Sequence, residues 1–206
     1  VTATLQLQDG VTNLGTVTYT FITGATSSNV GTFSFTGPAV AIPDNVPAGV
    51  NIPITVSGAG TKVVDLNFRF DPLAGCDATA GNTNAAVDHT FLGDLIFKLT
   101  SPAGTTVTFM QRRGSGGNNI CSLLFDDDGG FPAISTLPAT GGVSGNYAPE
   151  NPFSAFDGQT ANGTWTLNVS DNEGTDVGSV RGFSIILTTS TPVCCVCTPP
   201  VITAPT

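Results

Sequence analysis

The sequence predicts an all-β protein, and three features of its composition and patterning support this class. Charged residues make up only 10% of the 206 residues, whereas Gly (25) and Pro (14) are abundant. Gly and Pro destabilise helix interiors, whereas Thr, Val, Ile and Phe suit the half-buried surface of a pleated sheet. Short runs of alternating apolar and polar residues also recur along the chain, separated by Gly, Asn, Asp and Pro, as is typical of strands joined by turns.

Two alternating runs open the chain. Residues 1–8 alternate Val, Ala and Leu with Thr and Gln, the pair Asp9-Gly10 is a strong turn signal, and residues 16–21 alternate again. Asp9 is the only charged residue before Asp44, although solvent-facing edge strands usually carry charges that block unwanted pairing. We therefore expect these strands to be paired, either by addition to a neighbouring subunit or as a hairpin on their own domain.

The middle of the chain predicts a β-sandwich. Four prolines punctuate residues 37–53, which we interpret as an extended lead-in. Strands are then expected at sandwich-like spacing over Ile54–Val56, Val63–Phe70, Leu95–Thr100, Thr105–Met110, Ser122–Phe125, Thr164–Val169 and Phe183–Thr188. From Thr188 onward the sequence becomes a Pro- and Cys-rich tail.

Two local patterns refine this expectation. The turn sequence Ser101–Gly104 suits a type I or II turn, because Pro presets φ and Gly accepts a conformation that other residues resist, so it predicts a hairpin. Trp165 alternates with Leu167 and Val169, which places its ring in the core rather than on a sugar-binding surface.

The charge balance excludes several function classes. Six basic and fifteen acidic residues give a formal charge of −9. This balance argues against nucleic acid, whose binding rests on Lys and Arg, and against an anionic membrane surface. No apolar run approaches the roughly twenty residues of a membrane span. Because Val1 opens directly on a strand-like pattern without a signal peptide, we expect a mature or excised segment of a secreted, extracellular protein.

Five cysteines bear on the redox environment. Cys76 and Cys121 stand alone in ordinary segments, so an oxidising compartment would let them pair as a disulfide; the alternative is that all five are reduced. The tail cysteines Cys194, Cys195 and Cys197 lack the spacing of a zinc site and have no histidine nearby. The odd tail cysteine suits an intermolecular bond or a free thiol.

Several motifs occur in the order found in one known family. The stretch from Asp88 to Leu95 reads DHTFLGDL, and Leu99–Thr105 reads LTSPAGT. Further along come an acidic run at Phe125–Asp128, the sequence FDGQ at Phe156–Gln159, and NGTWTLNVSD at Asn162–Asp171. Together these resemble the P domain that follows the catalytic domain in subtilisin-like proprotein convertases, in its bacterial form. The resemblance covers about residues 40–189.

The resemblance implies a jelly-roll β-sandwich similar to galactose-binding domains, and it implies bound Ca²⁺. Ca²⁺ takes six to eight oxygen ligands, which acidic loops can supply. The candidate ligands are Asp94, Asp126, Asp127 and Asp171, with Asp128 and Asp157 as further members. The alternative for the loop at residues 126–128 is a solvated acidic turn. The spacing is not that of an EF-hand.

The sequence does not predict an enzyme. His89 is the only histidine and lies within the family motif, where we expect a structural role. A Ser-His-Asp triad would require it, and no subtilisin-like nucleophile motif is present. Paired carboxylates at residues 126–128 would need a cleft and a raised pKa to hydrolyse glycosides, and the sequence shows neither.

We expect three parts: residues 1–36 as a strand or hairpin extension that pairs between subunits, 37–191 as the sandwich, and 192–206 as a tail or linker. Three functions fit this organisation. The first is a calcium-stabilised structural subunit of an extracellular or cell-surface fibre, in which the N-terminal strand joins subunits into a homopolymer. The second is the accessory P domain of a secreted subtilisin-like protease. The third is a carbohydrate-binding module with glycan partners, for which fold analogy is a weak reason.

Overall fold

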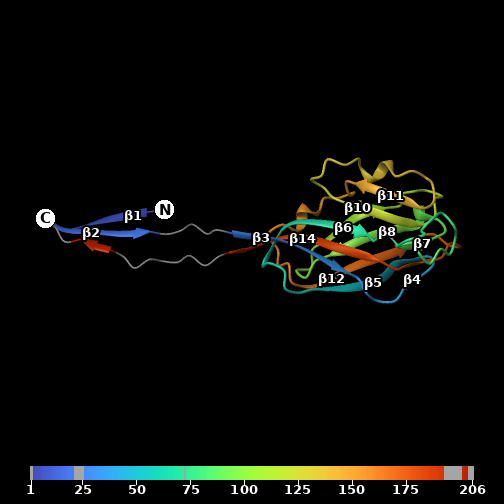
Figure 1. Cartoon of the computed structure of the whole chain (residues 1–206), viewed down its shortest axis with the longest axis horizontal. Coiled ribbons are helices and arrows are strands. Elements are labelled where there is room, and N and C mark those ends of the chain that lie inside the picture. The colour runs from blue at the N-terminus through green and yellow to red at the C-terminus, as the bar shows by residue number, and fades with distance from the viewer. Residues whose placement is uncertain (1, 21–25, 72, 193–200, 204–206) are drawn as a thin grey trace. The chain divides into compact units, whose positions relative to one another are not determined.

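The computed structural model describes residues 2–20, 26–71, 73–192 and 201–203. Strands dominate these residues, joined by three short 3₁₀ helices, η1 (Leu92–Asp94), η2 (Ile134–Thr136) and η3 (Phe153–Phe156), so the all-β prediction is confirmed (Figure 1). The chain forms two compact units. One comprises Val1–Ser27 together with Thr191–Thr206, and the other comprises Ser28–Ser190.

The larger unit is a β-sandwich, as predicted (Figure 1). One sheet has the order β3 (Thr26–Ser34), β14 (Phe183–Pro192), β6 (Lys62–Phe70), β10 (Ile120–Phe125), β7 (Val87–His89), β13 (Gly178–Val180) and β4 (Val40–Ile42), with β11 (Val143–Tyr147) also pairing with β10. The second sheet has the order β5 (Val46–Val56), β12 (Gly163–Asp171), β8 (Leu95–Thr100) and β9 (Thr106–Gln111). Strands far apart in the sequence therefore lie next to each other in both sheets.

Aromatic side chains fill the space between the sheets. Phe68 packs against several of these rings: its ring centroid lies 4.7 Å from that of Phe109 and 5.6 Å from that of Phe183. Trp165 is completely buried, and its indole N–H donates a 2.9 Å hydrogen bond to the Ala161 carbonyl. A buried indole needs such a partner. The predicted core position of Trp165 is therefore confirmed.

The local predictions agree with the structure. β8 and β9 form the predicted antiparallel hairpin, closed by a 2.9 Å hydrogen bond from the Ser101 amide to the Thr105 carbonyl. The strand predicted at Ile54–Val56 is longer, however, and begins at Val46. The prolines of residues 46–53 favour an extended loop in the sequence. However, β5 is an edge strand, and there a proline nitrogen can face the open side of the sheet. β3, β4, β7, β11, β13 and β15 had no predicted counterpart.

The predicted disulfide between Cys76 and Cys121 is present, with the two Cα atoms 5.6 Å apart. It fastens the long loop between β6 and β7 to the strand β10. Asn119 holds the same loop, because its amide nitrogen donates to the Asp77 carbonyl at 3.0 Å and to the Thr79 carbonyl at 2.7 Å. Cys194, Cys195 and Cys197 lie outside the described residues.

The smaller unit is a sheet of three strands with the order β1 (Thr2–Asp9), β2 (Thr12–Thr20) and β15 (Val201–Thr203). β1 and β2 form an antiparallel hairpin around Asp9-Gly10, where Gly10 has the positive φ of 60° that this turn requires. The hairpin is one of the two arrangements expected from the sequence. Pairing with a neighbouring subunit stays a prediction.

Candidate functional site

The family motif residue His89 lies at the end of β7 and is completely buried. Its Nε2 lies 3.2 Å from Oδ2 of Asp171, which is equally buried at the end of β12. Its Nδ1 lies 2.9 Å from the Phe91 carbonyl oxygen. Asp171 also accepts a 3.1 Å hydrogen bond from the Glu173 amide. The pair therefore ties β7 to β12, and the imidazole is held inside the protein away from any substrate in solvent.

Asp94 lies at the same end of the sandwich, in η1. Its carboxyl group is nearly buried, and burial raises its pKa, with further increases from the negative charges of Asp171 and Asp176. His89 and Arg112 partly offset this rise. The structure therefore brings the candidate ligands Asp94 and Asp171 together, along with Asp176, which the sequence analysis did not select.

The acidic loop after β10 forms a second, separate neighbourhood. Oδ1 of Asp126 accepts hydrogen bonds from the amides of Asp128 (3.0 Å) and Gly129 (2.7 Å). Asp127 accepts a 3.1 Å hydrogen bond from the Ser154 amide in η3. Asp157 follows η3 directly, and its pKa is raised by burial and then by Asp127 and Asp128. Four of the six candidate ligands thus share this neighbourhood.

Asp65, which the sequence analysis missed, belongs to the same neighbourhood. It lies on β6, the strand that pairs with β10 through Phe68 and Phe125. Burial, together with the charges of Asp128, Asp126 and Asp127, raises the pKa of Asp65 to about 6. No local pattern in the sequence marks Asp65, because only the pairing of two distant strands brings it beside the loop. We call Asp65, Asp126, Asp127, Asp128 and Asp157 the acidic surface.

No ion pair within the described residues involves the acidic surface. The four arginines form ion pairs elsewhere: Arg69 with Asp71, Arg112 with Glu173, Arg113 with Glu150 and Arg181 with Asp88. Beside Asp65, the side-chain oxygen Oδ1 of Asn67 is buried and has no hydrogen-bond partner. Its amide nitrogen lies 3.4 Å from the Asp65 carboxylate. The surface is therefore rich in oxygen atoms and strongly negative.

The six candidate ligands do not form one site. Asp94 and Asp171 lie with His89, whereas Asp126, Asp127, Asp128 and Asp157 lie on the acidic surface. Among residues 2–20, 26–71, 73–192 and 201–203, no three His, Cys, Asp or Glu side chains gather closely enough to enclose a metal ion. The ligand assignment stays a prediction. The chemistry of the acidic surface, with carboxylate and amide oxygens only, is that preferred by Ca²⁺.

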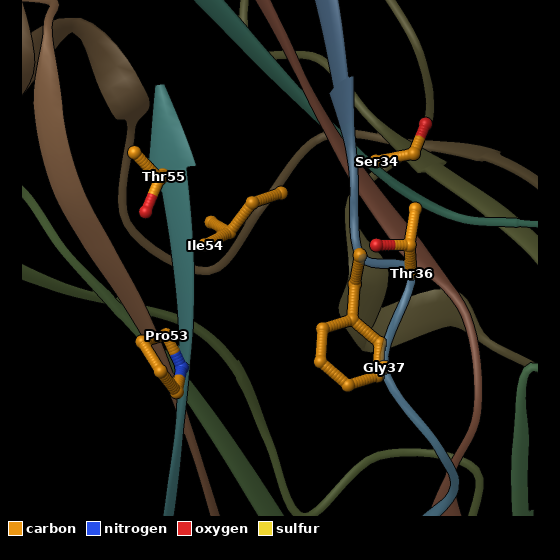
Figure 2. A pocket seen from close by; sticks show the side chains of 7 residues that line it. Ser34, Thr36, Gly37, Pro53, Ile54 and Thr55 are labelled. Atoms are coloured by element: carbon orange, nitrogen blue, oxygen red, sulfur yellow. The ribbon is translucent and has the colours of Figure 1, made fainter. Parts of the chain in front are cut away.

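A hollow of about 310 Å³ lies between β5 and the end of β3 with the segment that follows it (Figure 2). It is lined by Ser34, Phe35, Thr36, Gly37, Pro53, Ile54 and Thr55. Figure 2 shows the Ile54 side chain and the Thr36 hydroxyl directed across the gap between the two segments. None of the lining side chains is an acid or a base near neutral pH. The hollow therefore has hydroxyl groups but no side chain among its lining residues that could act as the general base to activate them.

The raised pKa of Asp65 predicts a pH dependence of stability in metal-free buffer. Between its unfolded pKa of 3.8 and its folded pKa of about 6, the folded protein binds more protons, so stability falls as pH rises through this window. We expect Asp65→Asn to raise the free energy of unfolding at pH 7.5 by about 1 kcal/mol, since solvent screening reduces the effect of a part-exposed group. At pH 3.5 the variant and wild type should unfold alike.

Denaturation in EDTA at the two pH values measures this difference. Asp77→Asn is the control, because hydrogen bonds from Thr79 and Asn82 lower the pKa of Asp77. Because its pKa is lowered in the folded protein, the ionised Asp77 carboxylate stabilises the folded state at pH values above the pKa of the unfolded chain. Its removal should therefore not raise the free energy of unfolding at pH 7.5. Equal effects of the two substitutions would contradict the assigned electrostatics.

By its fold the larger unit belongs to the class of β-sandwich modules, and its single histidine, His89, has a structural position in the interior. Comparison with known proteins gives its family. The proprotein convertase P-domain family matches residues 82–187. The chain belongs to this family, as the motifs predicted, and P domains are non-catalytic accessory modules of proteases.

Two curated relatives and one solved structure are similar to the chain. Leupeptin-inactivating enzyme 1 of Streptomyces exfoliatus is 27% identical over 151 residues, which are 71% of this chain and 24% of that protein. A calcium-dependent protease of Trichormus variabilis is 29% identical over 103 residues, covering 49% of this chain and 12% of the relative. The crystal structure of a serine protease of Aeromonas sobria is 17% identical, with a TM-score of 0.42, over 80% of this chain and 27% of that one.

The chain thus spans about a quarter or less of the length of these relatives. In the part of the chain that the structure describes, no helix is long and apolar enough to cross a bilayer.

Proposed function

We propose that this chain is the accessory P domain of a secreted protease, which packs against a catalytic domain of the same protein and stabilises it. The match to the P-domain family over residues 82–187 carries the proposal. Two relatives named as a leupeptin-inactivating enzyme and a calcium-dependent protease support it. The completely buried His89 is in keeping with a non-catalytic module.

Of the three functions considered from the sequence, this one has the most support. The fibre subunit stays a prediction without a supporting relative. For the carbohydrate-binding module, Trp165 is unsuitable as a sugar-stacking platform because it is completely buried.

Deletion of the sandwich from the parent protein tests the proposal. The gene that encodes this chain should also encode a subtilisin-like catalytic domain. Removal of residues 28–190 should leave a protease that still cleaves a small peptide substrate but loses activity faster on heating. A gene without a protease domain, or a truncated protease with unchanged thermal inactivation, would count against the accessory role.

We also propose that Ca²⁺ binds the acidic surface, which contains four of the six ligands expected from the resemblance, namely Asp126, Asp127, Asp128 and Asp157. The carboxylates of the acidic surface, with the unpartnered Asn67 oxygen beside Asp65, would attract the ion to the surface without enclosing it. One relative is named a calcium-dependent protease, which supports the proposal. The other two candidates, Asp94 and Asp171, are less suitable, since both Asp171 oxygens already accept hydrogen bonds within the protein or contact His89.

Calcium should therefore raise the melting temperature of the chain. Ligand that binds only the folded state stabilises it by RT ln(1 + [L]/Kd), so the midpoint should rise with calcium concentration and fall in EDTA. The increase should be smaller at pH 4.5, where Asp65 is mostly protonated, and smaller in Asp65→Asn at pH 7.5. Asp9→Asn, in the other unit, is the matched control. Identical melting with calcium and with EDTA would contradict the proposal.

A further inference from the structure

The strand β3 leaves one edge of the sandwich open to further pairing. An edge strand exposes unpaired amide and carbonyl groups, and proteins usually protect such an edge with prolines, charges or a covering segment. In the part of the chain that the structure describes, β3 ends its sheet and pairs only with β14. Its residues 28–34 include no charged residue and no proline, and Val30 is 65% exposed. None of the usual protections is therefore present in this part of β3.

The other edges of the sandwich are shorter or protected. β5, at one end of the second sheet, contains Pro47 and Pro53, which cannot donate to an added strand. At β9, the other end of that sheet, the Phe109 carbonyl already accepts a 2.8 Å hydrogen bond from the Glu150 amide. β4 and β11 have only three and five residues. Among the described strands of the sandwich, β3 thus offers the long unprotected edge.

Two hydrogen bonds show which residues of β3 face this edge. The Asn29 carbonyl accepts a 3.2 Å hydrogen bond from the Thr189 hydroxyl of β14, and the Phe35 amide donates one of 2.8 Å to the Phe183 carbonyl of β14. Backbone groups of successive residues in a strand point to opposite sides. Because Asn29 and Phe35 face β14, residues 30, 32 and 34 present their amides and carbonyls to the open side.

The hollow of Figure 2 lies at the end of the same edge. Its volume of about 310 Å³ lies between the end of β3 and β5, and Phe35 and Ile54 give it an apolar part. A peptide that adds to a sheet edge gains affinity from its main-chain hydrogen bonds and selectivity from pockets for its side chains. The open edge and the hollow together supply both elements.

Charge indicates which peptide fits. All charged residues except Asp9 lie in the sandwich unit, which has six basic and fourteen acidic residues and thus a formal charge of −8. Complementary charge speeds association, and like charge suppresses it. A basic segment is therefore favoured over an acidic one. A second copy of the sandwich, with the same negative charge, is disfavoured.

We propose that β3 is a docking edge for an extended basic segment of a partner protein, which adds as a further strand and places one apolar side chain in the hollow. The site does not depend on the protease role, because its test measures peptide binding alone.

Titration of the ¹⁵N-labelled full chain with the peptide acetyl-KTVLVTK-amide, observed by NMR, tests the proposal. We expect amide shifts confined to residues 28–36 and to the hollow, with a dissociation constant below about 1 mM. The peptide acetyl-ETVLVTE-amide should bind at least about tenfold more weakly at low salt, and this difference should shrink at high salt. Replacement of the central leucine by serine should weaken binding by at least about fivefold, because it empties the hollow.

Two variants of one residue separate strand addition from contact with side chains. Thr32→Pro removes an amide that faces the open side and should weaken binding at least about tenfold, while an edge strand tolerates the proline. Thr32→Val, the matched control, keeps the amide and should bind as the wild type does. Thermal melting checks that both variants are folded. A lack of shifts in residues 28–36, equal binding by the two variants, or equal binding of the basic and acidic peptides would overturn the proposal. Sedimentation that shows dimers of the peptide-free wild type but not of Thr32→Pro would also overturn it, in favour of a second copy.

Discussion

Substitution of Trp165 by Ala is expected to destabilise the sandwich by about 3–5 kcal/mol, the usual cost of removing a large aromatic side chain from a core. Trp165 is completely buried, and its ring packs edge-on against Phe156 with 5.1 Å between centroids. The substitution leaves a cavity between the sheets and also leaves the Ala161 carbonyl without its indole donor. Urea denaturation followed by far-UV circular dichroism measures the loss.

Two further variants separate the contributions to this loss. Trp165→Phe keeps most of the apolar volume but removes the hydrogen bond to Ala161, so it should cost about 1–2 kcal/mol, less than the Ala variant. Thr164→Ala changes an exposed neighbour on the same strand and should stay within about 0.5 kcal/mol of wild type. Similar losses in Trp165→Ala and Thr164→Ala would mean that Trp165 is not a core residue.

Removal of the disulfide is the second large effect. The Cys76→Ser/Cys121→Ser variant should lose about 4 kcal/mol if the closed loop, with a sequence separation of 45, acts by restricting the unfolded chain. Asn119 still anchors the loop through Asp77 and Thr79, so the native fold should survive.

Chemical denaturation with and without reductant checks this prediction. Reductant should destabilise the wild type by a similar amount, and it should leave the unfolding midpoint of the double variant unchanged. A double variant as stable as the oxidised wild type would show that the bond contributes nothing measurable.

Features encoded in neighbouring residues could be predicted from the sequence. The β8–β9 hairpin depends on the turn at Ser101–Gly104, and the burial of Trp165 follows from its alternation with Leu167 and Val169. The family motifs also indicated the sandwich. The start of β5 was missed because its prolines resemble a loop signal, although an edge strand tolerates them.

Features that depend on distant strands could not be predicted. Asp65 joins the acidic surface only because β6 pairs with β10, more than fifty residues further on in the sequence. The parallel pairing of β11 with β10 has no local signature either. The division of the candidate ligands into two groups also depends on contacts between distant strands. Asp94 and Asp171 lie with His89, whereas Asp126, Asp127, Asp128 and Asp157 lie on the acidic surface, and their positions in the sequence do not predict this separation.

Thermal inactivation of the parent protease carrying Trp165→Ala tests the accessory role most directly. If the sandwich stabilises a catalytic domain, weakening its core should shorten the half-life of peptide cleavage on heating, while the initial rate at low temperature stays unchanged. Thr164→Ala should leave the half-life as in the wild type. An unchanged half-life in Trp165→Ala, in a protein whose sandwich unfolds at a lower temperature, would contradict the proposed function.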